Sequence, residues 1–211
     1  AVSEDGRNGG REGADPRNVG SASSMGLAVV FFDYDSTLTI PQYIKRANKY
    51  ALADNPKLFA QMSEEEVFAN FGGRERVQRL AAMLHGLVQN SIELFIISLG
   101  FRDAILQHLS VVGLTGFFPP ARVFGQDSRE LFAVGFRKAR LIQWLLERHG
   151  WSRESALFVD DDNRHISLCR ELQACPCLKV RDHGLNETEL QAIEARAKGK
   201  LAIARDLCET F

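Results

Sequence analysis

Carboxylates gather at two places in this chain, each time at the end of a short apolar run. Asp33 and Asp35 follow residues 29–32, and three successive acids, 160–162, follow residues 156–159. Two carboxylates about 4 Å apart repel by roughly 4 kcal/mol at an effective dielectric constant near 20. That energy equals about three pKa units, so one acid stays protonated unless a cation lies between them. The pair predicts a divalent-cation site or a nucleophile beside a proton donor, and the alternative is a solvated turn.

A hydroxyl group and a lysine complete the set of candidates. Ser98 ends the apolar run 94–97, where it either caps a turn or binds a phosphoryl oxygen together with a backbone N–H. Lys138 falls in the first turn of a predicted helix, where a cation opposes the helix dipole. We expect its ammonium group to face an anionic site, which would offset that cost. The acids of residues 160–162 offer the oxygen ligands that Mg²⁺ prefers.

The elements around these residues alternate between buried strands and amphipathic helices. Apolar runs at 29–32, 94–97, 122–124, 156–159 and 177–180 predict parallel strands covered on both faces. Parallel strands present their carboxyl ends at one edge of a sheet, so the candidates should meet there. We predict a Rossmann-like three-layer α/β/α sandwich with a central parallel sheet and a small helical cap insertion. Residues 125–135 are expected to form a polar loop or hairpin.

The chain divides into three parts on this interpretation. Residues 1–25 have almost no large apolar side chains and are expected to form a disordered tail. Residues 26–40 and 73–211 form the core domain, and residues 41–72 form the cap insertion. The acid-rich segment 63–66 predicts a capping box within that insertion. Arg74 and Arg76 follow it and are expected to be solvated, with contact to an anionic substrate as the alternative.

An apolar strand followed by Asp-x-Asp-x-Thr-Leu resembles the first motif of the haloacid dehalogenase-like superfamily. The order Asp33-x-Asp35-x-Thr37, Ser98, Lys138 and Asp160-Asp161 matches that superfamily's set of motifs over roughly residues 27–181. The resemblance implies that Asp33 attacks phosphorus and forms an aspartyl-phosphate. It implies that Asp35 protonates the leaving oxygen and then activates water.

The same resemblance implies roles for the remaining candidates. Ser98, Lys138 and Thr37 would bind the phosphate, with Thr37 also stabilising the turn after the nucleophile. Asp33, Asp35 through its backbone carbonyl, and Asp160 or Asp161 would hold Mg²⁺. Asp161 is favoured because related proteins carry Gly-Asp at this point. His165 stands where many members of the superfamily have another acid. Which residues form the outer shell of the metal site is therefore left undetermined.

The expected activity is therefore hydrolysis of a phosphomonoester. The superfamily's dehalogenases do not use the second acid of the motif, so Asp35 points to phosphate chemistry. The substrate is expected to be a phosphorylated small molecule or protein. One alternative is a catalytically inactive regulatory or binding protein on the same fold. A second is a receiver-like signalling domain, but there the phospho-accepting Asp belongs to a later strand.

Composition excludes other classes of function. The 211 residues carry a net charge of −1, which gives no general attraction to nucleic acid or anionic membranes. No apolar run reaches the ~18 residues of a membrane span. The four cysteines lack the spacing of a disulfide framework or a zinc site, so we expect reduced thiols. Residues 1–25 lack the apolar core of a signal peptide, and a cytoplasmic location is expected unless this tail carries an address.

Overall fold

The computed structural model describes residues 26–42, 54–181 and 183–199. The strands are β1 (Val29–Phe32), β2 (Glu93–Ile97), β3 (Val123–Phe124), β4 (Ala156–Asp160) and β5 (Cys177–Lys179). The helices are α2 (Asn55–Ala60), α3 (Glu64–Asn70), α4 (Arg74–Gln89), α5 (Arg102–Val111), α6 (Arg129–Ala133), α7 (Lys138–His149), α8 (Asn163–Glu171) and α9 (Glu187–Ala197). The expected tail, 1–25, and part of the expected insertion, 43–53, lie outside the described residues.

The five strands form one parallel sheet in the order β3-β2-β1-β4-β5. The central strand β1 pairs with β2 and β4 along its whole length, from Val29 to Phe32. The order reverses direction at β1, because the chain moves outward to β2 and β3 and then returns to the other side. Such a switch point is where open α/β sheets place their ligand sites.

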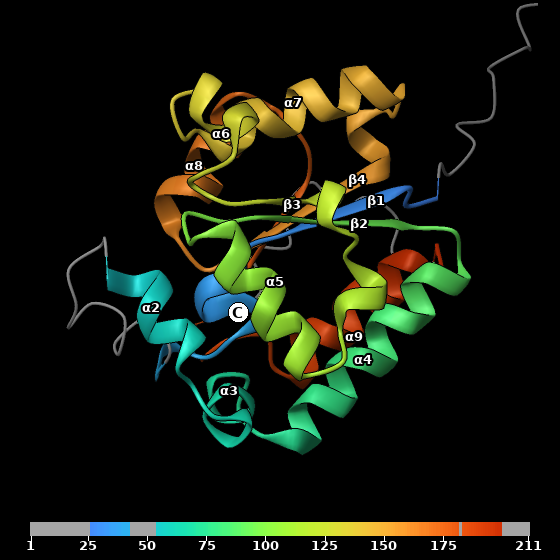
Figure 1. Ribbon diagram of the computed structural model, residues 1–211. Helices are drawn as coiled ribbons and strands as arrows, with labels where there is room; N and C mark the ends of the chain where they lie inside the picture. Colours follow the sequence, from blue (N-terminus) through green and yellow to red (C-terminus); the bar gives the residue numbers. More distant parts are fainter. Residues whose placement is uncertain (1–25, 43–53, 182, 200–211) are drawn as a thin grey trace, which may run out of the picture.

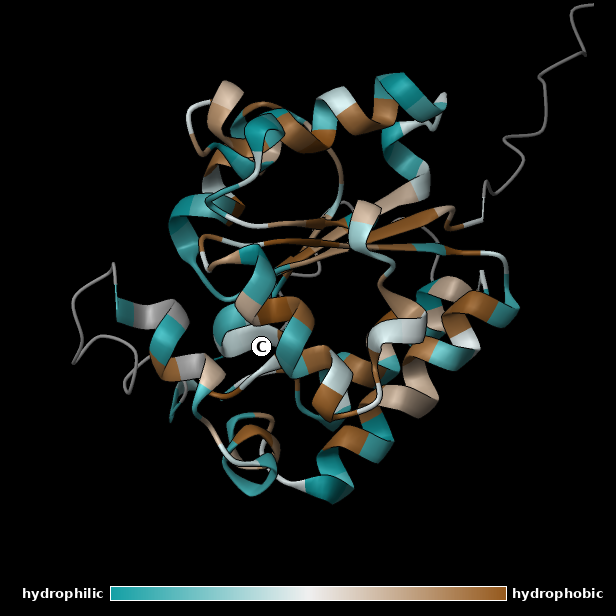
Figure 2. Ribbon diagram, in the orientation of Figure 1, coloured by the Kyte–Doolittle hydropathy of each residue, from teal (hydrophilic) through white to brown (hydrophobic). Residues whose placement is uncertain are grey.

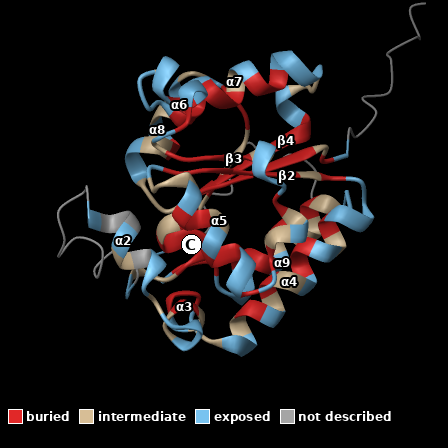
Figure 3. Ribbon diagram, viewed as in Figure 1, coloured by how far each residue is buried: buried red, intermediate tan, exposed pale blue. Residues whose placement is uncertain are grey.

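Helices cover both faces of the sheet, which confirms the predicted three-layer sandwich (Figure 1). Val30 and Phe32 pack toward α4, α5 and α9, whereas Val29 and Phe31 pack toward α7 and α8. Side chains that alternate along this one strand therefore contribute to two separate hydrophobic cores, one on each face of the sheet. The strands are hydrophobic along most of their length (Figure 2) and buried (Figure 3). Only a strand buried on both faces needs such an unbroken apolar run.

The described part of the insertion is helical. Helix α3 begins at the expected capping box, in which Ser63 accepts from the Glu66 N–H and Glu66 accepts from the Ser63 N–H. Helix α3 contacts α4 and α5, and Val67 and Phe71 join the core beneath the sheet. Within the ranges given above, no helix combines the length and apolarity needed to cross a membrane.

Two expectations about the core domain were wrong. Residues 125–135 were expected to form a loop or hairpin, but they contain helix α6, whose Leu131 is fully buried. Arg76 was expected to be solvated, but it is partly buried and donates hydrogen bonds to backbone carbonyls. These carbonyls belong to Thr37, Leu38, Phe71 and Leu185. Arg74 is exposed and pairs with Glu64, as a solvated side chain can.

Candidate functional site

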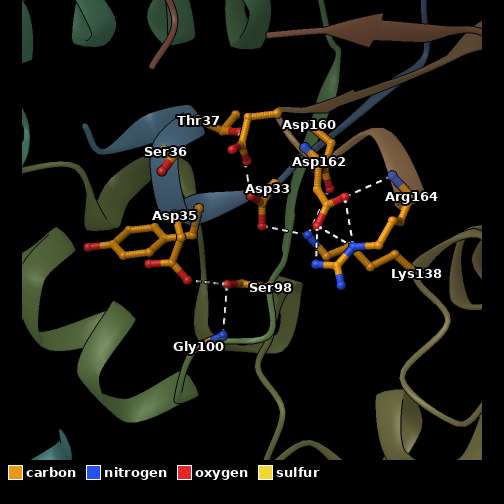
Figure 4. A network of polar contacts seen from close by, with 12 residues as sticks. Asp33, Asp35, Ser36, Thr37, Ser98, Gly100, Lys138, Asp160, Asp162 and Arg164 are labelled. Carbon is orange, nitrogen blue, oxygen red and sulfur yellow. Dashed lines mark hydrogen bonds and ion pairs between the residues drawn. The ribbon is translucent and has the colours of Figure 1, made fainter. Parts of the chain in front are cut away.

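The candidates from four separate segments come together at the carboxyl edge of the sheet (Figure 4). Asp33 directly follows β1, Ser98 directly follows β2, and Asp160 ends β4. Lys138 is the first residue of α7, as its place in the sequence predicted. The strand order brings the three strand ends side by side, since β1 lies between β2 and β4.

Lys138 is the centre of the buried charge network. Its Nζ lies 2.6 Å from Asp33 Oδ1 and 2.8 Å from Asp160 Oδ2, and its side chain is only 2% exposed. Burial lowers the pKa of Lys138, but the charges of Asp33 and Asp160 outweigh burial and hold that pKa above its usual range. The ammonium group therefore stays charged and fixes both carboxylates.

Asp35 belongs to a second polar chain beside the first. The Ser98 hydroxyl donates to Asp35 Oδ2 at 3.3 Å and accepts from the Gly100 N–H at 2.9 Å. Asp35 Oδ1 is buried and makes no hydrogen bond within the described part of the chain. Ser98 thus positions Asp35 here, and its expected contact with phosphate stays a prediction.

The three acids after β4 occupy different environments. Asp160 is fully buried and accepts from Lys138 and from the Asp162 N–H at 2.7 Å. Asp162 caps α8 and pairs with Arg164, whose hydrogen bonds lower the pKa of Asp162 to about 2. Asp161 is partly exposed, and its Oδ1 lies 3.5 Å from the Thr37 hydroxyl. Of these three carboxylates, that of Asp161 is the least engaged in hydrogen bonds and ion pairs.

Oxygen atoms of Asp33, Asp160 and Asp161 all lie within 4.8 Å of one another, and this is the group among the described residues that could hold a metal ion. The ligands are all carboxylates, which suit a hard cation such as Mg²⁺. Burial and neighbouring negative charge raise the pKa of Asp33, and burial followed by the charge of Asp160 raises that of Asp161. These acids outnumber the single lysine, so the donor set fits a divalent cation.

The turn that carries Asp35 is irregular. Ser36 adopts a left-handed backbone conformation, φ 58°, within the segment Tyr34–Leu38. Thr37 points its hydroxyl toward Asp33 Oδ2 at 3.5 Å. Thr39 closes the turn, because its hydroxyl accepts from the Ser36 N–H at 3.2 Å and donates to the Tyr34 carbonyl at 3.1 Å. Thr39 is fully buried, and the sequence pattern did not single it out.

Replacing Thr39 by Val is expected to lower the free energy of unfolding by about 1–3 kcal/mol. Valine keeps the shape but leaves the buried Ser36 N–H without its acceptor. Urea unfolding of the wild type, Thr39→Val and Thr39→Ser measures the effect. Thr39→Ser retains the hydroxyl and should recover most of the loss. Equal stability of the valine and serine variants would contradict this role.

Burial raises the pKa of Asp35 to about 6, with the charge of Lys138 and the Ser98 hydrogen bond acting in the opposite direction. The folded state therefore binds more protons than the unfolded state between pH ~4 and ~6. The free energy of unfolding therefore falls as pH rises through that window, because raising the pH disfavours the state that binds more protons. A shift of this size corresponds to about 3 kcal/mol.

Asp35→Asn is accordingly expected to be more stable than the wild type at pH 7.5 without metal, by up to about 3 kcal/mol. The advantage should vanish near pH 4, where the wild-type carboxyl is protonated. Urea unfolding in EDTA at both pH values tests this. Asp103→Asn is the control, since its side chain is 90% exposed. A variant that is less stable than the wild type at pH 7.5 would refute the linkage.

Glycine is needed next to the site at Gly125, directly after β3. A Cβ there would lie 2.7 Å from the Gly100 carbonyl oxygen and against the backbone N–H of Arg102. The Gln126 N–H donates to that same carbonyl at 2.9 Å. The segment after β3 thus holds the Gly100 loop, whose N–H in turn contacts Ser98. In the sequence, the signal was a glycine directly after a strand. Such a glycine can mark a place where another backbone segment approaches closely.

Comparison with known proteins was informative for the fold. No protein-family model and no curated protein matches the sequence. A candidate phosphatase from Clostridium difficile matches with a TM-score of 0.50 and 16% identity, covering 80% of this chain and 92% of that one. The fold is shared. Because the identity is this low, the likeness shows architecture alone, and it agrees with the Rossmann-like α/β/α sandwich predicted from the sequence.

Two further structures show weaker similarity. A haloacid dehalogenase-like family hydrolase from Streptococcus pneumoniae is 17% identical, with a TM-score of 0.49 and coverage of 79% and 90%. L-2-haloacid dehalogenase from Xanthobacter autotrophicus is also 17% identical, with a TM-score of 0.43 and coverage of 78% and 81%. At such low identity, the reaction has to be argued from the site.

Proposed function

We propose that this chain is a haloacid dehalogenase-like hydrolase, specifically a Mg²⁺-dependent phosphomonoesterase that acts through an aspartyl-phosphate on Asp33. The observation that carries the proposal is the placement of Asp33 between a buried ammonium group and a second acid. Asp33 Oδ1 contacts Lys138 Nζ, and Asp35 lies two residues further along the chain with a pKa raised to about 6 by burial. This arrangement offers a fixed nucleophile and a proton carrier that works near neutral pH.

The first half of the reaction uses Asp33 and Asp35. A carboxylate oxygen of Asp33 forms a bond to phosphorus while the bond from phosphorus to the ester oxygen breaks. Protonated Asp35 gives its proton to the departing oxygen, so an alcohol leaves. Lys138 lies against Asp33 and offsets the negative charge of the transferring phosphoryl group.

The second half reverses the role of Asp35. Its carboxylate takes a proton from water, whose oxygen attacks phosphorus and releases inorganic phosphate from Asp33. A raised pKa allows both protonation states to be populated near pH 6, which acid and base steps in one cycle require. Ser98 holds the Asp35 carboxylate in place through both steps.

Asp33 and Asp161 would hold Mg²⁺. Asp160 already accepts from Lys138 and from the Asp162 N–H, whereas Asp161 is partly exposed and less committed. We therefore favour Asp161 over Asp160 as the main carboxylate ligand, with the Asp35 backbone carbonyl completing the protein ligands. When bound, the cation supplies positive charge that offsets the carboxylates and the phosphoryl oxygens.

The substrate is proposed to be a phosphorylated small molecule or protein. Helices α2 and α3 belong to the insertion proposed as a small cap, and a short cap leaves room for a large leaving group. A cytoplasmic location is part of the same proposal. Asp35 favours phosphate esters over halides, because a departing alkoxide needs a proton and a halide does not.

Release of phosphate from p-nitrophenyl phosphate tests the proposal, with Mg²⁺ and with EDTA. We expect turnover that disappears in EDTA and returns when Mg²⁺ is added in excess. Halide release from a 2-haloacid is measured in parallel and should be absent. Thermal unfolding with and without Mg²⁺ shows whether the metal binds. A folded, metal-loaded protein that hydrolyses neither this ester nor a panel of phosphorylated metabolites would contradict the proposal and favour a binding protein.

A further inference from the structure

Three thiols meet on the face of the sheet covered by α7 and α8, in a cluster separate from the acidic site. Cys169 lies near the end of α8, Cys175 precedes β5, and Cys177 opens β5. The Cys169 and Cys175 sulfur atoms are 3.9 Å apart, and Cys177 Sγ lies 3.4 Å from the Cys175 carbonyl oxygen. All three are free thiols. The sequence showed only the close pair 175 and 177, because contact with Cys169 depends on how α8 packs on β5.

The three thiols differ in exposure and in the hydrogen bonds between them. Cys169 and Cys175 are buried beside Ile166 and Ala174, whereas Cys177 is partly exposed and forms the edge of the cluster. Hydrogen bonds from the Cys175 and Cys177 thiols lower the pKa of Cys169, so Cys169 ionises first.

We propose that Cys169 and Cys175 form a redox dithiol that hydroperoxides convert to an intramolecular disulfide. The Cys169 thiolate sulfur attacks one peroxide oxygen, the O–O bond breaks, and hydroxide leaves from hydrogen peroxide. The Cys175 sulfur then displaces the hydroxyl group of the sulfenic acid, which departs as water once protonated. In total two thiols lose two electrons and two protons, and one peroxide becomes two molecules of water.

The geometry favours this pairing over the adjacent one. A disulfide has a sulfur–sulfur distance near 2.05 Å, so the two sulfurs must approach by about 2 Å from their contact distance. Cys169 and Cys175 lie on either side of a short turn, with the Ala174 N–H bonded to the Cys169 carbonyl. Cys177 is held by pairing between β4 and β5, where Phe158 faces Cys177. Movement of the turn is therefore less costly than movement of the strand.

Peroxide titration of the reduced, folded 211-residue chain tests the proposal. The chain is treated with hydrogen peroxide in EDTA, unfolded in alkylating reagent, digested and mapped by mass spectrometry. We expect loss of two of the four free thiols, one peptide pair that joins Cys169 to Cys175, and full return of both thiols with dithiothreitol. The map needs no substitution, so it does not depend on the folding of a variant.

Variants then assign the residues. Cys169→Ala and Cys175→Ala should each abolish the disulfide, whereas Cys177→Ala and Cys208→Ala should retain it. Circular dichroism establishes that each variant is folded before oxidation. A disulfide that pairs Cys177 with either partner, oxidation limited to sulfinic or sulfonic acids, or a disulfide that forms only in urea would each overturn the proposal.

Discussion

Asp33→Asn is expected to reduce phosphate release from p-nitrophenyl phosphate by at least about a thousandfold. The amide lacks the charge and nucleophilicity of the carboxylate, so no bond to phosphorus forms and no aspartyl-phosphate accumulates. A thousandfold loss corresponds to about 4 kcal/mol of activation free energy. Steady-state kinetics with saturating Mg²⁺ measures the loss, and intact mass after rapid quenching detects the phosphorylated chain in the wild type alone.

The structure provides a matched control for this substitution. Asp103→Asn makes the same chemical change on a side chain that is 90% exposed, and its activity should remain within twofold of the wild type. The amide oxygen that Asp33→Asn introduces can still accept a hydrogen bond from Lys138, so the variant should fold. If Asp33→Asn kept more than a tenth of the wild-type rate in a preparation free of contaminating phosphatase, Asp33 would not be the nucleophile.

Lys138→Met is expected to destabilise the metal-free protein by about 3–5 kcal/mol at pH 7.5. The substitution leaves the carboxylates of Asp33 and Asp160 buried without the ammonium group that lies 2.6 and 2.8 Å from them. Activity should fall by at least about a hundredfold, because the ammonium group that lies against Asp33 and offsets the phosphoryl charge is removed. Urea unfolding in EDTA, together with steady-state kinetics, measures both effects.

Three comparisons test whether the destabilisation by Lys138→Met arises from the unpaired buried charges. The destabilisation should shrink as the pH falls toward 4.5, because the unpaired acids can then be protonated. Lys138→Met with Asp160→Asn should recover part of the loss, since one buried charge is removed. Lys57→Met, on a side chain 79% exposed, should change stability by less than about 0.5 kcal/mol. A Lys138→Met variant within 1 kcal/mol of the wild type at pH 7.5 would mean that the network contributes little.

Local pattern was enough to predict the sheet and the places of the catalytic candidates. Residues 29–32 form a strand buried on both faces because four consecutive apolar side chains can be satisfied only between two layers. The ends of such strands meet at one edge, so Asp33, Ser98 and Asp160 were expected at the same edge, and the strand order then made them neighbours. The capping box at 63–66 was predictable for the same reason, since it depends on residues three apart.

Contacts between distant segments could not be read in this way. Arg76 follows a glycine pair and looks solvated, yet it donates to carbonyls from three separate segments, which only the folded arrangement places around it. Residues 125–135 are rich in polar and glycine residues, yet burial of Leu131 stabilises the short helix α6 that local propensity does not predict.

The sequence by itself determined which chemical groups this protein has and at which edge of the sheet they gather. Periodicity and strand ends are local, and they carry that information without any knowledge of packing. Only the tertiary structure decided how those groups are paired. In the folded protein Asp160 forms an ion pair with Lys138, Ser98 donates a hydrogen bond to Asp35, and the sulfur of Cys169 contacts that of Cys175. Distances of a few ångströms between residues far apart in the chain depend on how the helices pack on the sheet, which no local pattern encodes.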